Sequence, residues 1–493
     1  MMNKGLSKAA LRLLDGLTDS FPSTVPQMFQ RALLGVVGSR PVFRFYQTRY
    51  RRQWNSAEQL NLSENKSLAP QKILFVVDVC IGDTILASEC LPIIRRAYPN
   101  AELHLLCNRT GGELVEGMPG IRVHNLVRGD RGMPSKEDLA AIRALLEREA
   151  FALVLNLGPF YTKKQLTRRG KRTLPQTVIQ LFVPFGMFVL RAWKEDGRRH
   201  ISYLARIFMQ DFLALRPQLQ SHGGDLADQL AIIGQSSSSR NDLLNTNSVY
   251  LSAESIAAAK AFLDSHGLTP GSGIVFFNPD ATSQFGLMPL SLQKQIVSRI
   301  AEMEDVRAIL IGEAFTNRGI EQDVIDSLDS VSQRKVVIVP HMSIGSYVAL
   351  IDASDMYISG DTGPLHIAAT KKISPKDSAP MRNRTVILAI YGATDSRMYG
   401  YDSEQPNHVP ANQNAPSRAF TAPVSCRNIT CVNKFGKFCS EVRCFDRLPV
   451  EEVAAYVAAY FGQLADQRSK NSRVEERSSP NRITIDMERA YAL

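Results

Sequence analysis

The feature that most constrains the fold of this chain is a regular alternation of short apolar runs with longer segments of helical spacing, beginning at Lys72. Strands separated by helices of this length are typical of an α/β protein with a parallel, doubly wound sheet. The expected strands of the first half are residues 73–79, 102–107, 121–126 and 153–157, and the expected helices are residues 85–98 and 136–149.

A second alternating run begins near residue 253. Its expected strands are residues 274–278, 308–311, 336–339, 356–358 and 385–390, and its expected helices are residues 253–266, 290–303, 344–353, 450–461 and one that starts at Pro364. The Ser-rich segment 234–241 lacks an apolar period and separates the two runs. Because 493 residues exceed what one core supports, we expect two doubly wound domains, over residues 71–240 and 241–464.

The two ends of the chain lie outside this pattern. Residues 1–70 are predicted to form a basic helical extension, and residues 465–493, which are polar and mixed in charge, a disordered tail. The first helix of the extension either packs on the protein's own core or lies at a membrane interface. Its apolar stripe comprises Leu6, Ala10, Leu13 and Leu17, and its off-stripe cations are Lys4, Lys8 and Arg12.

The net charge of +10 is concentrated in residues 1–70 and 163–200. Basic stretches attract phosphate on nucleic acids, lipids or nucleotides. The apolar segment 179–190 beside the second stretch favours an anionic membrane surface and not nucleic acid, although it is too short to span a bilayer. With no signal-like apolar region and with Cys80, Cys90 and Cys107 scattered through the predicted core, we expect a cytoplasmic protein, peripheral on the inner face of the membrane.

Three turns that follow predicted strands carry the candidate chemistry, since ligands of doubly wound sheets bind beyond the carboxyl ends of the strands. The first turn comprises residues 80–84. Its Gly82 permits a tight bend, and its Asp83 offers a carboxylate that could accept a proton. The alternative is that Asp83 caps a helix starting near Thr84. The second turn, residues 278–284, offers the hydroxyls of Thr282 and Ser283 to phosphate oxygens, or is an ordinary loop.

The third turn, residues 359–366, combines glycines that allow close backbone approach with a proline suited to the first turn of a helix. A helix start offers free N–H groups and positive potential to a diphosphate. Taken singly, Asp361 could be a helix cap and His366 a buried imidazole with a partner. Their combination with Thr362 and Gly363 indicates a ligand site.

In this order and at this separation, the three turns resemble the heptosyltransferase family, glycosyltransferase family 9, of bacterial lipopolysaccharide synthesis. The resemblance covers roughly residues 72–462. Within that range, residues 391–394 and 448–453 are supporting matches. It implies the GT-B architecture, in which two Rossmann-like domains face a cleft, with the acceptor bound mainly by the first domain and a nucleotide-sugar donor such as ADP-heptose by the second.

The resemblance also implies residue roles in an inverting sugar transfer to a lipid-linked glycan, with no required cofactor. Asp83 would be the general base. The donor would be held by Thr282, Ser283, Asp361, Thr362, Gly363 and His366.

The chain departs from the family pattern in two places. Where the family supplies a Lys or Arg followed by Trp-Pro, this chain has Gln284-Phe285-Gly286-Leu287-Met288-Pro289, and Lys294 falls in a predicted helix. Residues 371–384 are longer than the usual link and are predicted to be a surface insertion.

Four cysteines near the C-terminus could form a structural zinc site, packed thiols or a disulfide, and all three alternatives stay open. They are separated by four, seven and four residues: Cys426, Cys431, Cys439 and Cys444. Two other functions stay open for the whole chain, a nucleotide-sugar epimerase on the same scaffold and an inactive membrane-associated glycolipid-binding protein.

Overall fold

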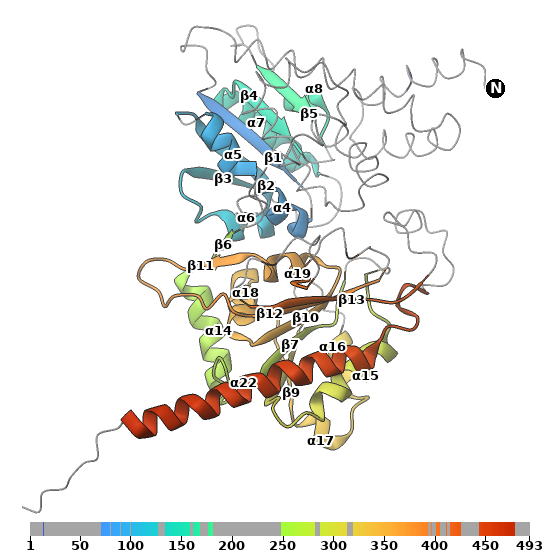
Figure 1. Ribbon diagram of the computed structural model, residues 1–493. Coiled ribbons are helices and arrows are strands. Elements are labelled where there is room, and N and C mark those ends of the chain that lie inside the picture. The colour runs from blue at the N-terminus through green and yellow to red at the C-terminus, as the bar shows by residue number, and fades with distance from the viewer. Residues whose placement is uncertain are drawn as a thin grey trace, which may run out of the picture.

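The computed structural model of the chain contains two parallel sheets, one above the other in Figure 1. The structure describes Leu13 and residues 71–478, apart from residues 79, 89, 99, 127–133, 158–160, 168–175, 181–247, 282–285, 313–318, 393–395, 397–400, 405–410, 412–414 and 425–442. The predicted N-terminal extension, apart from Leu13, and the Ser-rich segment lie outside the described residues.

The first sheet has five strands, all in parallel register. They are β1 (Lys72–Val77), β2 (Glu102–Asn108), β3 (Ile121–Leu126), β4 (Leu153–Asn156) and β5 (Thr177–Gln180). The helices between them are α4 (Ile81–Ala87), α5 (Cys90–Ala97), α6 (Arg109–Val115), α7 (Lys136–Glu149) and α8 (Lys163–Leu166).

The second sheet has six parallel strands, and a separate pair of strands lies beside it. The six are β7 (Ile274–Asn278), β8 (Ala308–Ile311), β9 (Val336–Ile338), β10 (Met356–Gly360), β12 (Val386–Tyr391) and β13 (Ser417–Thr421), and the pair is β6 (Ser248–Tyr250) with β11 (Lys371–Ile373). The helices are α14 (Ala253–Ser265), α15 (Leu290–Ala301), α16 (Ile320–Ile325), α17 (Ser330–Gln333), α18 (Ile344–Ala353), α19 (Gly363–Ala368) and α22 (Val450–Ser478), with a short 3-10 turn at Arg443–Phe445.

Both sheets have the strand order of a Rossmann fold. Counted along the chain, the first sheet reads 3-2-1-4-5 and the second 3-2-1-4-5-6. The order therefore reverses between β1 and β4 in the first sheet and between β7 and β10 in the second. The predicted α/β class with parallel, doubly wound sheets is confirmed.

Three apolar clusters hold the layers together. One cluster packs α7 on the first sheet, and another packs α15 and α22 on the second. The third is shared by the two halves, because Ile85 of α4 and Leu114 of α6 belong to the same cluster as Val249 of β6 and Leu365 of α19. Figure 1 shows α4 and α6 at the lower end of the first half, next to β6, α18 and α19 of the second. The junction between the halves is thus a continuous apolar core.

The last helix is longer than expected. It was predicted over residues 450–461 with disorder from residue 465, whereas α22 continues to Ser478, so the predicted tail is wrong for residues 465–478. This stretch is polar, but more than half of its residues are Ala, Gln, Arg, Lys or Glu, which have high helix propensity. The polar composition favours disorder, but the helix propensity of these residues and the packing of the first turns of α22 favour the helix, which is what forms.

The predicted insertion, residues 371–384, is only partly a surface loop. It begins with β11, which pairs with β6 at the junction. The buried Lys372 side chain donates to the carbonyls of Ala368 and Thr370, and burial lowers its pKa to about 7. Asp352 accepts hydrogen bonds from the backbone N–H groups of Arg382 and Asn383 at 2.7 and 2.8 Å. Both ends of the segment are therefore fixed to the second half.

Candidate functional site

All three predicted turns follow strands at the points where the strand order reverses. The first turn follows β1, the second follows β7 and the third follows β10. Because β7 and β10 are hydrogen-bonded neighbours, the second and third turns leave the sheet side by side. Ligands of doubly wound sheets bind at this position.

Asp83 lies in the first turn of α4 and its side chain is partly exposed. The helix begins at Ile81 and not near Thr84, and its N-cap residue, Cys80, makes no side-chain capping bond. The interpretation of Asp83 as a helix cap is therefore wrong. A negative charge in the first turn of a helix interacts favourably with the helix dipole.

Thr362, and not Asp361, caps α19. Its hydroxyl accepts a hydrogen bond from the backbone N–H of Leu365 at 3.3 Å and lies 3.0 Å from the hydroxyl of Ser359. The capping interpretation of Asp361 is therefore wrong as well. The hydroxyl of Thr362 is engaged within the protein, so its predicted contact with a ligand would compete with these bonds.

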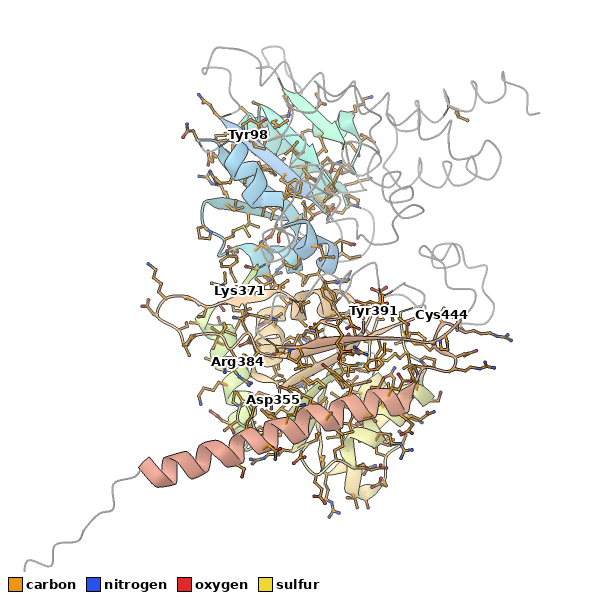
Figure 2. The ribbon with its side chains drawn as sticks, in the orientation of Figure 1. Tyr98, Asp355, Lys371, Arg384, Tyr391 and Cys444 are labelled. Carbon is orange, nitrogen blue, oxygen red and sulfur yellow. The ribbon has the colours of Figure 1, made fainter. Side chains whose placement is uncertain are left out.

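The His366 ring is buried and held from two sides. Its Nδ1 lies 3.0 Å from the hydroxyl of Tyr401, and its Nε2 lies 3.9 Å from a carboxylate oxygen of Asp361. Tyr391, labelled in Figure 2, ends β12 nearby, and its pKa is raised by burial and by the negative charges of Tyr401, Asp361 and Asp402 when these groups are ionised. The third turn thus presents a carboxylate and an imidazole whose orientations are fixed.

Asn278 links the second turn to the third. Its buried amide nitrogen donates to the hydroxyl of Ser359 at 3.0 Å and to the carbonyl of Asp280 at 3.2 Å. Its side-chain oxygen is buried and has no hydrogen-bond partner among the residues that the structure describes. Thr282 and Ser283 lie outside the described residues. Lys294 belongs to α15, as predicted.

The first and third turns touch across the junction of the two halves. A Cβ atom placed on Gly82 would lie 2.8 Å from the Cα of Gly363 and 2.9 Å from Cδ2 of His366. Gly82 directly precedes Asp83 in α4. The residue before the predicted base therefore meets Gly363 and His366, two of the predicted donor-binding residues, although they come from different halves of the chain.

Sequence reasoning missed Tyr401 as a partner of His366. The two residues are separated by 35 positions, with strands β11 and β12 between them. No local pattern marks Tyr401, so only the folded chain identifies it.

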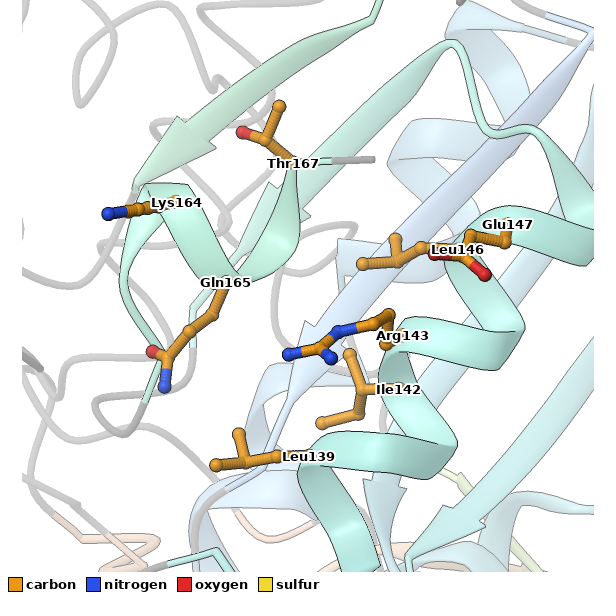
Figure 3. A pocket seen from close by; sticks show the side chains of 8 residues that line it. All are labelled: Leu139, Ile142, Arg143, Leu146, Glu147, Lys164, Gln165 and Thr167. Carbon is orange, nitrogen blue, oxygen red and sulfur yellow. The ribbon is translucent and has the colours of Figure 1, made fainter. Parts of the chain in front are cut away.

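A separate pocket in the first half lies between α7 and α8 (Figure 3). Two cations, Arg143 and Lys164, and one acid, Glu147, line it together with Leu139, Ile142, Leu146, Gln165 and Thr167. Lys164 belongs to the basic stretch of residues 163–200, most of which lies outside the described residues. None of the three turns contributes to this pocket.

Two further predictions depend largely on residues outside the described part of the chain. Of the four clustered cysteines only Cys444, labelled in Figure 2, is described, and it is buried. Within the described residues there is no group of three or more His, Cys, Asp or Glu side chains that could hold a metal ion. Likewise, none of the helices in the described ranges is both long and apolar enough to cross a membrane.

Comparison with known proteins identifies the second half. Residues 249–426 match the sequence model of glycosyltransferase family 9 (heptosyltransferase). The chain carries a family 9 glycosyltransferase domain. The predicted resemblance is confirmed, and with it the prediction that the chain is a glycosyltransferase. The matched range contains the second and third turns, whereas Asp83 lies before it.

A solved structure with a similar fold bears on the architecture. The crystal structure of a glycosyl transferase family 9 protein from Veillonella parvula DSM 2008 has a TM-score of 0.52 at 15% identity and covers 80% of this chain and 98% of that chain. This likeness confirms the predicted GT-B architecture. Two other structures are more distant. The structure of E. coli ADP-heptose lps heptosyltransferase II has a TM-score of 0.45 at 12% identity and covers 80% of this chain and 99% of that chain. The structure of E. coli heptosyltransferase WaaC with ADP has a TM-score of 0.44 at 12% identity and covers 79% of this chain and 99% of that chain. No curated protein sequence matches the chain.

Proposed function

We propose that this family 9 glycosyltransferase is an inverting enzyme in which Asp83 is the general base. The observation that supports the proposal is the contact of the first turn with the third, through Gly82 and the His366 ring. Because Asp83 directly follows Gly82 in α4, this contact supports a position of its accessible carboxylate close to the third turn. A transferase needs such a pairing, because the base must reach the acceptor hydroxyl while the donor is held still.

In the proposed reaction Asp83 takes the proton of the acceptor hydroxyl as the acceptor oxygen attacks the anomeric carbon of the donor sugar. The new C–O bond forms on the face opposite the leaving group, so the configuration at that carbon inverts. The bond between the anomeric carbon and the diphosphate oxygen breaks, and the nucleoside diphosphate leaves with the electron pair. The transition state resembles an oxocarbenium ion, as in glycoside hydrolysis.

On the donor side we assign Asp361, Gly363 and His366 to the nucleotide sugar and Thr282 and Ser283 to its diphosphate, with no resident metal ion. Thr362 would contribute mainly by holding the turn, since its hydroxyl caps α19. The description of the matched family as heptosyltransferase supports heptose as the sugar and ADP-heptose as the first donor to test.

For the acceptor we propose a lipid-linked glycan such as a lipopolysaccharide core, reached from the cytoplasmic face of a bacterial inner membrane. The basic stretches of residues 1–70 and 163–200 support this location through attraction to anionic lipid. Reversing the charge of Lys163, Lys164, Arg168 and Arg169 should release the protein from anionic vesicles. Unchanged vesicle binding would remove this part of the proposal.

The decisive assay incubates the protein with ADP-heptose and other nucleotide sugars together with a truncated lipid A–core acceptor. Asp83→Asn should lower kcat by about 10³-fold, within the usual contribution of a general base. The matched control is Asp323→Asn, which alters an exposed acid in the first turn of α16 and should leave kcat unchanged.

Equal product from the wild type and Asp83→Asn would exclude Asp83 as the base. Epimerised donor in the absence of acceptor would favour a nucleotide-sugar epimerase. Glycolipid binding without turnover of any donor would favour an inactive binding protein.

A further inference from the structure

The contact between the two halves at the site is made by a pair of glycines. A Cβ atom on Gly82 would lie 2.8 Å from the Cα of Gly363, and a Cβ atom on Gly363 would lie 2.7 Å from Cγ2 of Ile81 and 3.2 Å from the backbone nitrogen of Gly82. Separations below 3.0 Å are essentially never observed for a real Cβ atom. An alanine at position 82 would therefore force α4 and α19 apart, and an alanine at position 363 would have to displace the buried Ile81 side chain or do the same.

Neither glycine is required by its own backbone conformation, because neither has a positive φ angle. Each lies in the first turn of a helix, where alanine is otherwise the better helix former. The two positions demand glycine only because the other turn is so close. This reason for glycine is invisible within either half alone.

The surroundings of the pair are apolar and closely packed. Ile81 and Ile85 of α4 and Leu365 of α19 are all buried and belong to the cluster shared by the two halves. A close-packed interior cannot absorb an added methyl group without moving backbone or side chains. The separation of α4 and α19 is therefore set by the glycine contact and cannot be adjusted cheaply.

That separation also fixes the geometry of the proposed site. Asp83 follows Gly82 in α4, and the His366 ring that faces Gly82 is oriented by Tyr401. An increase in the distance between α4 and α19 would move the base away from the donor-binding groups. A displacement of about 1 Å at a reacting centre can lower a rate by about 10²-fold.

We propose that Gly82 and Gly363 are positioning residues, which act by setting the distance from Asp83 to the donor-binding turn. The inference rests on the proposed transferase function for its effect on catalysis. Its structural part, contact of the two halves through these glycines, is independent of which reaction the protein performs.

The test compares Gly82→Ala and Gly363→Ala with Gly462→Ala. Gly462 lies in α22, where a Cβ atom would meet nothing within 4 Å, so this control adds the same methyl group without a clash. We expect both site variants to lose about 10²-fold in kcat, and Gly82→Ala, which leaves every assigned donor-binding residue in place, to show little change in the KM for ADP-heptose. Solution X-ray scattering of the nucleotide-free proteins should show a larger radius of gyration for both, and Gly462→Ala should match the wild type.

A compensating substitution separates positioning from loss of folding. Ile81→Ala removes the Cγ2 atom that a Cβ atom on Gly363 would meet, so it should restore part of the kcat and the compact scattering profile of Gly363→Ala. It should not rescue Gly82→Ala, whose clash is with the Gly363 backbone and the His366 ring. Variants that merely unfold would show no such selectivity.

Wild-type kcat and unchanged scattering in both glycine variants would overturn the inference. If no donor is turned over by the wild type, the proposed function fails, yet scattering and the selective rescue of compactness still decide the glycine contact.

Discussion

The turn after β1 and the turn after β10 contain the same kinds of residues, but they differ in helix capping and in the burial of their acidic side chains. Both follow a central strand of a Rossmann-like sheet, both contain a glycine and an acid, and both lead into a short helix. Asp83 is partly exposed in a helix whose N-cap residue makes no capping bond. Asp361 has a side chain that is 6% exposed and lies beside the buried His366.

This difference matches two different tasks. A nucleotide sugar must be held in one geometry, and a buried network of polar groups provides that because it has few alternative arrangements. A base that takes a proton from an incoming hydroxyl must remain accessible. The difference is the one that the proposed roles require, in which the second half would hold the donor and the first would admit the acceptor. Four measurements would test this contrast, from the largest expected effect to the smallest.

The largest effect concerns the residues at the starts of the two strands. Asp355, labelled in Figure 2, is buried before β10 and accepts hydrogen bonds from the N–H groups of Gly273 and Ile274 at 2.8 and 2.9 Å and from Arg382 at 3.1 Å. Asp355→Ala should reduce the free energy of unfolding by about 3 kcal/mol, because buried donors lose their acceptor.

The counterpart at the start of β1 is Lys72, which pairs with Glu149 at 2.7 Å near the surface. Lys72→Ala should cost about 1 kcal/mol, the upper end for an ion pair near the surface, because the side chains of Lys72 and Glu149 are 34% and 11% exposed. Thermal unfolding of both variants measures the difference, and equal losses of stability would contradict the contrast.

The second prediction compares the two acids. Asp361→Asn should weaken the binding of ADP-heptose about 30-fold, near 2 kcal/mol, since a buried charged acceptor is lost from the donor side. Asp83→Asn should bind the same donor as the wild type does, while losing turnover. Isothermal titration with ADP-heptose distinguishes them, and weaker donor binding in the Asp83 variant would argue against the division of tasks.

The third prediction applies one substitution to both turns. Thr362→Val removes the cap of α19 and the bond to Ser359, and should destabilise the protein by about 1–2 kcal/mol. Thr84→Val removes bonds to the carbonyls of Cys80 and Val77, at 3.2 and 3.4 Å, and should cost under about 1 kcal/mol because the Cys80 carbonyl keeps the backbone N–H of residue 84 as a donor. A larger loss for Thr84→Val, measured as a shift of the melting temperature, would reverse the expected order.

The strands and the three turns could be predicted because their signals are local. Apolar runs identify buried parallel strands such as β7, and Gly, Pro and Asp identify turns regardless of what lies opposite. The start of α4 was missed because Cys80 gives no capping signal. The length of α22 was missed because a polar helix and a disordered segment have similar compositions.

The arrangement of the site could be predicted only in outline. The sequence pattern indicates that Asp83 and Asp361 both follow strands, but the contact of Gly82 with Gly363 depends on how two domains dock. The partnership of His366 with Tyr401 likewise depends on the path of the chain through β11 and β12. Side-chain partners that are distant along the chain leave no periodic trace in it.

The smallest expected effect is a pH dependence carried by the first sheet alone. The rings of His104 on β2 and His124 on β3 lie 2.7 Å apart between nitrogens, with Glu102, Glu149, Lys72, Arg122 and Arg148 around them. Burial, and then the neighbouring His104, lower the pKa of His124 to about 4.

Because the pKa of His124 is lower in the folded protein than its ordinary value near 6.5, the unfolded chain binds this proton first as the pH falls. The stability tied to His124 is therefore intact above pH 6.5 and is lost between pH 6.5 and about 4. We expect His124→Gln to lose about 1 kcal/mol less than the wild type over this interval, after allowing for the partial exposure of the ring. Melting temperatures measured from pH 8 to pH 4 test this, and parallel curves for the two proteins would show that the histidine pair does not control the acid sensitivity of the first sheet.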